Sequence, residues 1–133
     1  MPETVLYVCT TCRRPGDDPD GPRAGALLLE ALQARGGALP GLRVEPVECL
    51  SVCKRPCTVA VASADRWTYV YGDMDPAASA DTILAGLAAY AETPDGLVPW
   101  RARPAAFRTG VIARIPPFPH PRPRPAGTLE AAE

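Results

Sequence analysis

The sequence predicts an α/β sandwich in which helices cover a small mixed sheet, and three observations support this fold class. Short runs of β-branched and aromatic residues combine with two amphipathic segments in the order β-α-β-β-β-α. The length of 133 residues suits one hydrophobic core rather than two. Eight of the 17 prolines lie between Pro99 and Pro125, so long regular elements are expected only before that segment.

The first half of the chain predicts a strand, a loop, a helix and a second strand. Residues 4–8 form an apolar β-branched run that ends at Cys9, and residues 10–21 are polar and rich in Pro, Gly and Asp. Pro22 suits the first turn of a helix, where its missing N–H is no loss. The apolar positions that follow share one helical face, and Gly36-Gly37 ends it: Ala24, Leu27, Leu28, Ala31 and Leu32.

The second half predicts two paired strands and a helix. Residues 42–47 form the second strand, and Pro46 places it at a sheet edge or a bulge. Residues 58–62 and 67–71 are expected to form a hairpin, and Asp75-Pro76 is a typical helix start. The apolar stripe of this helix comprises Ala80, Ile83, Leu84, Leu87, Ala88 and Ala91.

Charge and proline content divide the chain into a domain over residues 1–96 and an extended segment over residues 97–133. Residues 97–129 carry six arginines and no acid. Apolar residues such as Trp100, Phe107 and Ile115 are expected to anchor the first half of this segment on the domain. Residues 116–125 predict polyproline-like chain, in which the lone His120 is expected to be a spectator.

The bulk properties narrow the functional classes. A net charge of −1 argues against general nucleic-acid binding. No apolar run approaches the roughly 18–20 residues of a membrane helix, and no signal peptide is visible, so a cytoplasmic protein is expected. Thiols stay reduced there, and an odd count of five cysteines suits a metal or redox site better than a disulfide framework.

The five cysteines form two compact groups, each following a predicted strand. Cys9 and Cys12 are spaced as C-x2-C, and Cys49, Cys53 and Cys57 lie within nine residues. If the two strands are parallel neighbours, both groups lie at one end of the sheet. Spacing alone leaves an iron–sulfur cluster, a zinc site and a thiol–disulfide pair open, with buried structural cysteines as the simplest alternative. With one histidine, no Ser/His/Asp set is expected, and an electron carrier or metal-binding protein is favoured over an enzyme.

Two resemblances extend these expectations. The loop Cys49–Cys53, followed by Pro56 and a valine-rich strand, resembles the C-x3-C loop of the thioredoxin-like [2Fe–2S] ferredoxins. This resemblance implies a thioredoxin-like fold and a [2Fe–2S] cluster with two further ligands after the first strand. In those ferredoxins the two N-terminal cysteines are much farther apart than Cys9 and Cys12, and Cys57 is an additional thiol.

A second resemblance covers nearly the whole chain. Residues 8–14, 49–59, 67–73, 94–101 and 110–117 together resemble an uncharacterised bacterial family described only as predicted metal-binding proteins. Members are often encoded beside cobalamin-biosynthesis genes. The resemblance implies a redox or metal-accepting protein partner, with the cobalamin pathway as its source.

Three functional hypotheses follow. The first is a [2Fe–2S] ferredoxin-like protein held by Cys9, Cys12, Cys49 and Cys53, with Cys57 as a neighbour or substitute. In it, Lys54 and Arg55 would offset the charge of the anionic cluster and raise its potential. The second is a zinc- or cobalt-binding module or metal donor, and the third is a thiol oxidoreductase that acts through Cys9 and Cys12. A homodimer formed through the strands is a further expectation.

Overall fold

The sheet contains five strands in the order β2-β1-β3-β4-β5. The structure, a computed structural model, describes residues 3–35 and 39–118. Strand β1 (Thr4–Cys9) is parallel to β2 (Leu42–Val47) and antiparallel to β3 (Val59–Ser63). Strand β4 (Thr68–Tyr71) pairs antiparallel with β3 and with β5 (Val111–Ile115). The predicted mixed sheet and hairpin are confirmed, and the Pro46-containing strand lies at an edge.

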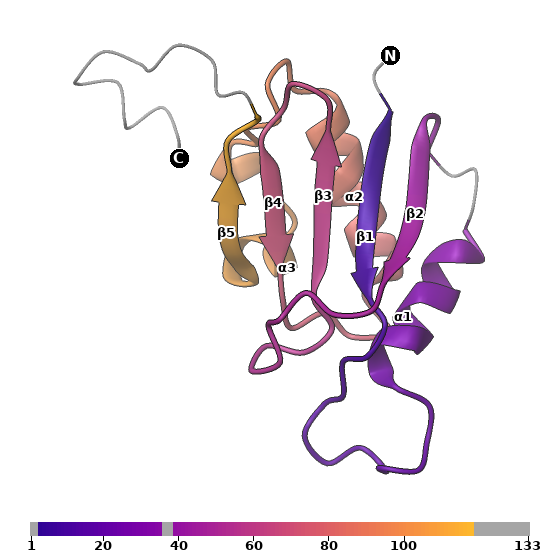
Figure 1. Cartoon of the computed structure of the whole chain (residues 1–133). Helices are drawn as coiled ribbons and strands as arrows, with labels where there is room; N and C mark the ends of the chain where they lie inside the picture. The colour runs from indigo at the N-terminus through magenta and orange to yellow at the C-terminus, as the bar shows by residue number, and fades with distance from the viewer. Residues whose placement is uncertain (1–2, 36–38, 119–133) are drawn as a thin grey trace.

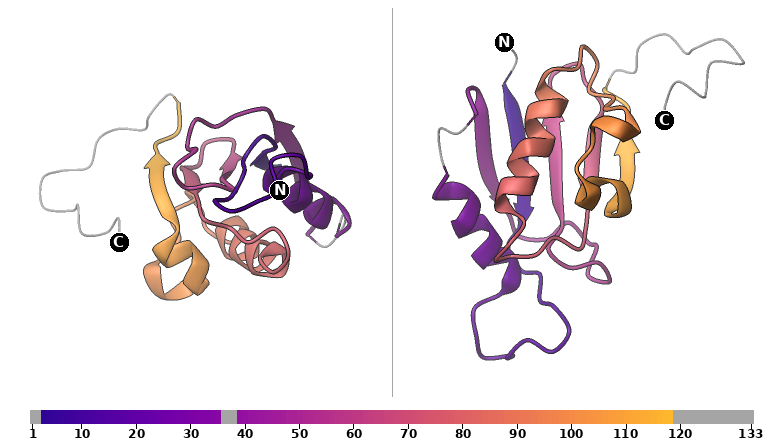
Figure 2. Two further views of the ribbon diagram at one scale, coloured as in Figure 1. Left: turned by 90° about the horizontal axis from the view of Figure 1, so that it is seen from below. Right: turned by 180° about the vertical axis from the view of Figure 1, so that it is seen from behind.

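All helices lie on one side of this sheet (Figure 1 and Figure 2). They are α1 (Ala24–Gln33), α2 (Ala80–Ala91), the 3-10 helix η1 (Trp100–Ala102) and α3 (Ala105–Thr109). The core between the two layers contains Leu6 and Val8 from β1, Leu28 from α1 and Leu87 from α2, all with no exposed surface. None of the helices formed by residues 3–35 and 39–118 lies over the opposite side of the sheet.

Two predicted helix starts are too early. The helix expected from Pro22 begins at Ala24 and ends at Gln33, and the Gly36-Gly37 pair lies outside the described residues. The helix expected from Asp75-Pro76 begins at Ala80. Asp75 does accept backbone hydrogen bonds, from Ala77 (2.7 Å) and Ala78 (3.1 Å), but these close a separate turn before the helix. A capping pattern therefore identified the turn correctly and the helix boundary wrongly.

The segment after residue 96 contributes more than anchoring side chains. Its short strand β5 extends the sheet, and Phe107 of α3 stacks on Tyr71 with ring centroids 3.8 Å apart. Arg103 is buried, donates to the Val98 carbonyl and lies over the Tyr69 ring. This fifth strand was not predicted, because the proline content after residue 96 was expected to prevent long regular elements there. His120 and the rest of the predicted polyproline segment from Pro119 lie outside the described residues.

No helix in the described part of the chain is long and apolar enough to cross a membrane.

Candidate metal centre

Both cysteine groups lie at one end of the sheet, as the parallel pairing of β1 and β2 requires (Figure 1). Thr10 donates its backbone N–H to the Val47 carbonyl (2.9 Å), and the Thr11 hydroxyl donates to the Glu48 carbonyl (2.5 Å). These bonds join the chain after β1 to the chain after β2. The two groups that lie 37 residues apart in sequence, from Cys12 to Cys49, are therefore neighbours in space.

Cys9 and Cys12 form a buried thiol pair. Their exposed fractions are 3% and 6%, and the Cys12 thiol donates to the Cys9 sulfur across 3.1 Å. This distance is well beyond the roughly 2.05 Å of a disulfide bond, so the contact is a hydrogen bond. Burial alone would raise the pKa of Cys9, but hydrogen bonds from the Cys12 thiol, from the Leu50 backbone and from Thr11 outweigh it and lower that pKa. Of the two thiols, Cys9 therefore loses its proton more readily.

Cys12 titrates in the opposite direction. Burial raises the pKa of Cys12, its hydrogen bond to Cys9 and the negative charge there raise it further, and backbone groups of Thr58 and Cys57 oppose the shift. The two pKa values of the pair are therefore pushed in opposite directions.

A glycine in α1 makes room for this pair. A Cβ at Gly25 would lie 2.0 Å from the Cys9 carbonyl oxygen, so a side chain does not fit there. The Gly25 N–H donates to the Cys12 carbonyl (3.1 Å), and the Arg23 guanidinium donates to the Thr11 carbonyl (2.9 Å). The chain between Cys12 and Arg23 thus forms a protruding loop whose two ends are joined by these hydrogen bonds. Gly25 was not singled out from the sequence, because its partner is a backbone atom distant in the chain.

Cys57 is the third buried thiol, with 1% of its surface exposed. Thr58, the residue after Cys57, accepts a hydrogen bond from the Cys9 N–H through its carbonyl (3.1 Å). This bond places Cys57 beside the thiol pair. Burial is the main reason that the pKa of Cys57 is raised to about 12, and repulsion from the neighbouring Cys12 in its thiolate form adds to the shift. Its φ of 62° lies in the left-handed region, an unusual conformation for cysteine.

Cys49 and Cys53 differ from the other three because both are exposed. The Cys49 sulfur accepts the Ser51 N–H (3.2 Å), and Ser51 also adopts a left-handed φ of 62°. Within residues 3–35 and 39–118, no three cysteine, histidine or carboxylate side chains gather closely enough to hold a metal ion. The structure therefore brings the five predicted thiols to one end of the sheet without closing a metal site among them.

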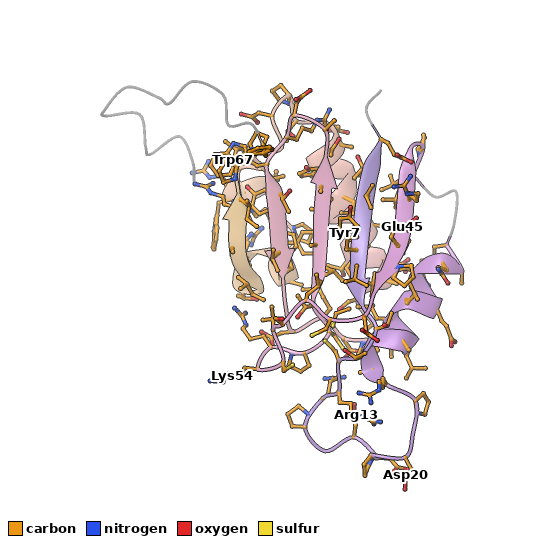
Figure 3. All side chains as sticks on the ribbon, viewed as in Figure 1. Tyr7, Arg13, Asp20, Glu45, Lys54 and Trp67 are labelled. Atoms are coloured by element: carbon orange, nitrogen blue, oxygen red, sulfur yellow. The ribbon has the colours of Figure 1, made fainter. Side chains whose placement is uncertain are left out.

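The two basic residues of the loop have different surroundings. Arg55 pairs with Asp73 (2.7 Å) and donates to the Thr109 carbonyl (3.1 Å), which fastens the loop to the end of α3. Lys54 projects from the loop, away from the sheet (Figure 3). A role for either residue in tuning a bound group stays a prediction.

Comparison with solved structures identifies the fold. The chain is similar to a thioredoxin-like [2Fe–2S] ferredoxin from Aquifex aeolicus, with 19% identity and a TM-score of 0.55 over 86% of this chain and 94% of the ferredoxin. A second structure of the wild-type ferredoxin from that organism gives 20% identity and a TM-score of 0.54 over 85% and 99% of the two chains. At this identity the likeness shows the fold, and the predicted thioredoxin-like fold is confirmed. No curated protein matches the chain.

Residues 6–117 match the model of one protein family, and the chain belongs to it. This is the family described as "Protein of unknown function (DUF1636)". The predicted membership of an uncharacterised family is confirmed, whereas the link to cobalamin genes stays a prediction.

Proposed function

We propose that the protein binds a [2Fe–2S] cluster and carries electrons. The observation that carries this proposal is the placement of all five cysteines at one end of a thioredoxin-like sheet, in two loops that hydrogen-bond to each other. The proposed ligands are Cys9 and Cys12 from the first loop and Cys49 and Cys53 from the second. Cys57 would be a neighbour or a substitute ligand.

The donor chemistry fits such a cluster. Four thiolates are the usual ligand set of a [2Fe–2S] centre, and the chain offers five thiols. Cys9 already carries a lowered pKa, and thiolates rather than thiols bind metals. The exposed thiols lie in a loop without helix or strand, so that loop can bring them toward Cys9 with little cost to the sheet. A bound cluster would supply one-electron transfer at the exposed end of the molecule.

Anaerobic purification with iron and sulfide analysis tests the proposal. The expected protein is brown and contains iron and acid-labile sulfide in equal amounts. The double variant Cys12→Ala with Cys57→Ala should remove nearly all iron, because it leaves three thiols where the cluster needs four. Cys57→Ala, a matched control at the same end of the sheet, should retain most of it. A colourless protein that does not take up iron and sulfide contradicts the proposal, and one zinc or cobalt ion per chain without sulfide supports the metal-module hypothesis instead.

A dithiol function is a second candidate, favoured by the 3.1 Å contact between Cys9 and Cys12. In thiol–disulfide exchange, the Cys9 thiolate would attack a disulfide of a partner protein and release one partner thiolate. Cys12 would then displace the second, so the pair is oxidised to a disulfide while the partner gains two thiols. A measurable dithiol potential in metal-free protein, lost in Cys12→Ser, would support this function.

The proposed partner is a redox or metal-accepting protein. Its assignment to cobalamin biosynthesis rests on the family resemblance alone. The chain's own contribution to recognition would be the loop that carries Lys54, which lies beside the exposed thiols.

A further inference from the structure

The side of the sheet opposite the helices, called here the open face, is apolar across most of its width. Strand residues alternate between the two sides of a sheet, and Leu6, Val59 and Tyr69 lie in the core. Their neighbours along each strand therefore lie on the open face, which faces the viewer in Figure 3. The apolar members of this face are Val5, Tyr7, Ala60, Ala62, Val70, Ala113 and Ile115.

The strand register arranges these side chains in two rows across the strands. The first row contains Arg43, Val5 and Ala62, and the second contains Glu45, Tyr7, Ala60, Val70 and Ala113. Thr68 and its register partner Ile115, which is 50% exposed, extend the first row across β4 and β5. Each row thus has one charge at the β2 end and small or apolar side chains elsewhere.

We propose that the open face binds a second copy of this chain about a two-fold axis that crosses the strands between the two rows. Such an axis places the first row of each copy on the second row of the other. Arg43 of each copy then faces Glu45 of the other, and Tyr7 faces Val5. The face is self-complementary in charge, as a two-fold interface requires.

Size complementarity supports the same arrangement. Tyr7 is paired in register with Ala60, so a large side chain stands beside a small one. In this arrangement Ile115 of one copy packs on the smaller Ala113 of the other. Tyr7 of one copy packs on the smaller side chains of Val5 and Ala62 of the other. Two sheets packed in this way lie about 10 Å apart with their strands roughly 30° from parallel.

The charge content of the open face favours a second copy over a strongly charged partner. Arg43 already pairs with Glu45 of β2 (2.9 Å) and with Glu3, which precedes β1 (3.1 Å), so the charges of this region gather at the β2 edge of the face and include both signs. The middle of the face, at Tyr7 and Ala60, carries none. The inference does not depend on the proposed cluster, because the cysteine loops lie at one end of the sheet.

Sedimentation equilibrium of the full chain tests the dimer. The expected wild-type result is a concentration-dependent dimer between about 1 μM and about 1 mM, the range for an interface of modest area. Ala62→Arg should abolish dimerisation, because it places a long charged side chain in the apolar contact. Leu27→Arg is the matched control, since Leu27 is 39% exposed on α1, on the helical side.

A charge exchange gives a second, independent test on exposed residues. Arg43→Glu should weaken the dimer about tenfold, which corresponds to about 1.4 kcal/mol, because it sets acid against acid. The double variant Arg43→Glu with Glu45→Arg should restore the wild-type affinity. A protein that stays monomeric at every concentration overturns the proposal, as does a dimer that Leu27→Arg weakens while Ala62→Arg and Arg43→Glu do not.

Discussion

Cys9 and Cys12 lie buried where β1 ends, whereas Cys49 and Cys53 lie exposed in a loop with no regular structure. The first pair is fixed by the sheet, by hydrogen bonds that its own segment donates to carbonyls at the end of β2 and before β3, and by the close approach of Gly25. The second pair has one sulfur contact, from the Ser51 N–H to Cys49. In the proposed cluster site, the buried pair would set the geometry and the exposed pair would complete the ligand set.

The largest expected effect comes from filling the space beside the buried pair. Gly25→Ala should destabilise the metal-free protein by about 3 kcal/mol, because the new Cβ would lie 2.0 Å from the Cys9 carbonyl oxygen. Helix propensity alone predicts the opposite sign, a gain of about 1 kcal/mol for alanine. Urea unfolding under reducing conditions measures the difference.

Gly21→Ala is the control for this substitution. Its Cβ would meet nothing closer than 3.4 Å, so the free energy of unfolding should change by less than about 1 kcal/mol. If Gly25→Ala proves as mild as Gly21→Ala, the Cys9 backbone is not held against α1 and the rigidity of the first pair is refuted.

Thiol reactivity should separate the exposed Cys49 and Cys53 from the buried Cys12 and Cys57 by about 100-fold. In metal-free reduced protein at pH 8, iodoacetamide should modify Cys49 and Cys53 at least that much faster than Cys12 or Cys57, because a buried thiol reacts only when the structure opens locally. Cys57 is slowed further, since a pKa of about 12 leaves roughly one thiolate in ten thousand at this pH. Peptide mapping by mass spectrometry measures each rate, and the difference should vanish in urea. Equal rates in the folded protein would contradict the contrast between the pairs.

The sheet and the position of the cysteines were predictable because they depend on local patterns. The apolar run of residues 4–8 and the alternation around Pro46 identified β1 and β2, and a parallel pairing then required both cysteine groups to lie at one end. The C-x2-C spacing likewise identified Cys9 and Cys12 as a pair, which the 3.1 Å contact confirms.

Burial and backbone contacts between distant segments were not predictable. Nothing in the sequence distinguishes exposed Cys53 from buried Cys57, four residues later, because the difference depends on a left-handed backbone at Cys57 and on where β3 begins. The role of Gly25 depends on a carbonyl sixteen residues earlier. Strand β5 was missed because its five residues acquire a strand conformation by pairing with β4.

Alkaline pH should destabilise the metal-free protein through Cys57. Its folded pKa of about 12 exceeds the roughly 8.5 of an unfolded cysteine, so the folded state keeps a proton that the unfolded state loses. This contribution is complete below about pH 8.5 and is lost as pH rises toward 12. The free energy of unfolding should fall by about 1.4 kcal/mol per pH unit in this window.

Cys57→Ala isolates this contribution. The variant should unfold with a free energy that falls less steeply between about pH 8.5 and 10, below the range where Tyr90 begins to contribute through its own pKa, which burial raises to about 12. Parallel pH profiles for the wild type and Cys57→Ala would mean that Cys57 is accessible to solvent, like Cys49.

The smallest effect is expected in the exposed loop. Arg55 and Asp73 form an ion pair at 2.7 Å, but their side chains are 35% and 51% exposed, so a double-mutant cycle with Arg55→Gln and Asp73→Asn should give a coupling below about 1 kcal/mol. Lys54→Gln, a charge change at the neighbouring position, should leave stability within about 0.5 kcal/mol of the wild type. Because Arg55 also donates to the Thr109 carbonyl, a coupling well above 1 kcal/mol would mean that α3 holds this loop firmly. Cys49 and Cys53 would then be as fixed as Cys9 and Cys12, and a cluster could not be completed by moving the loop.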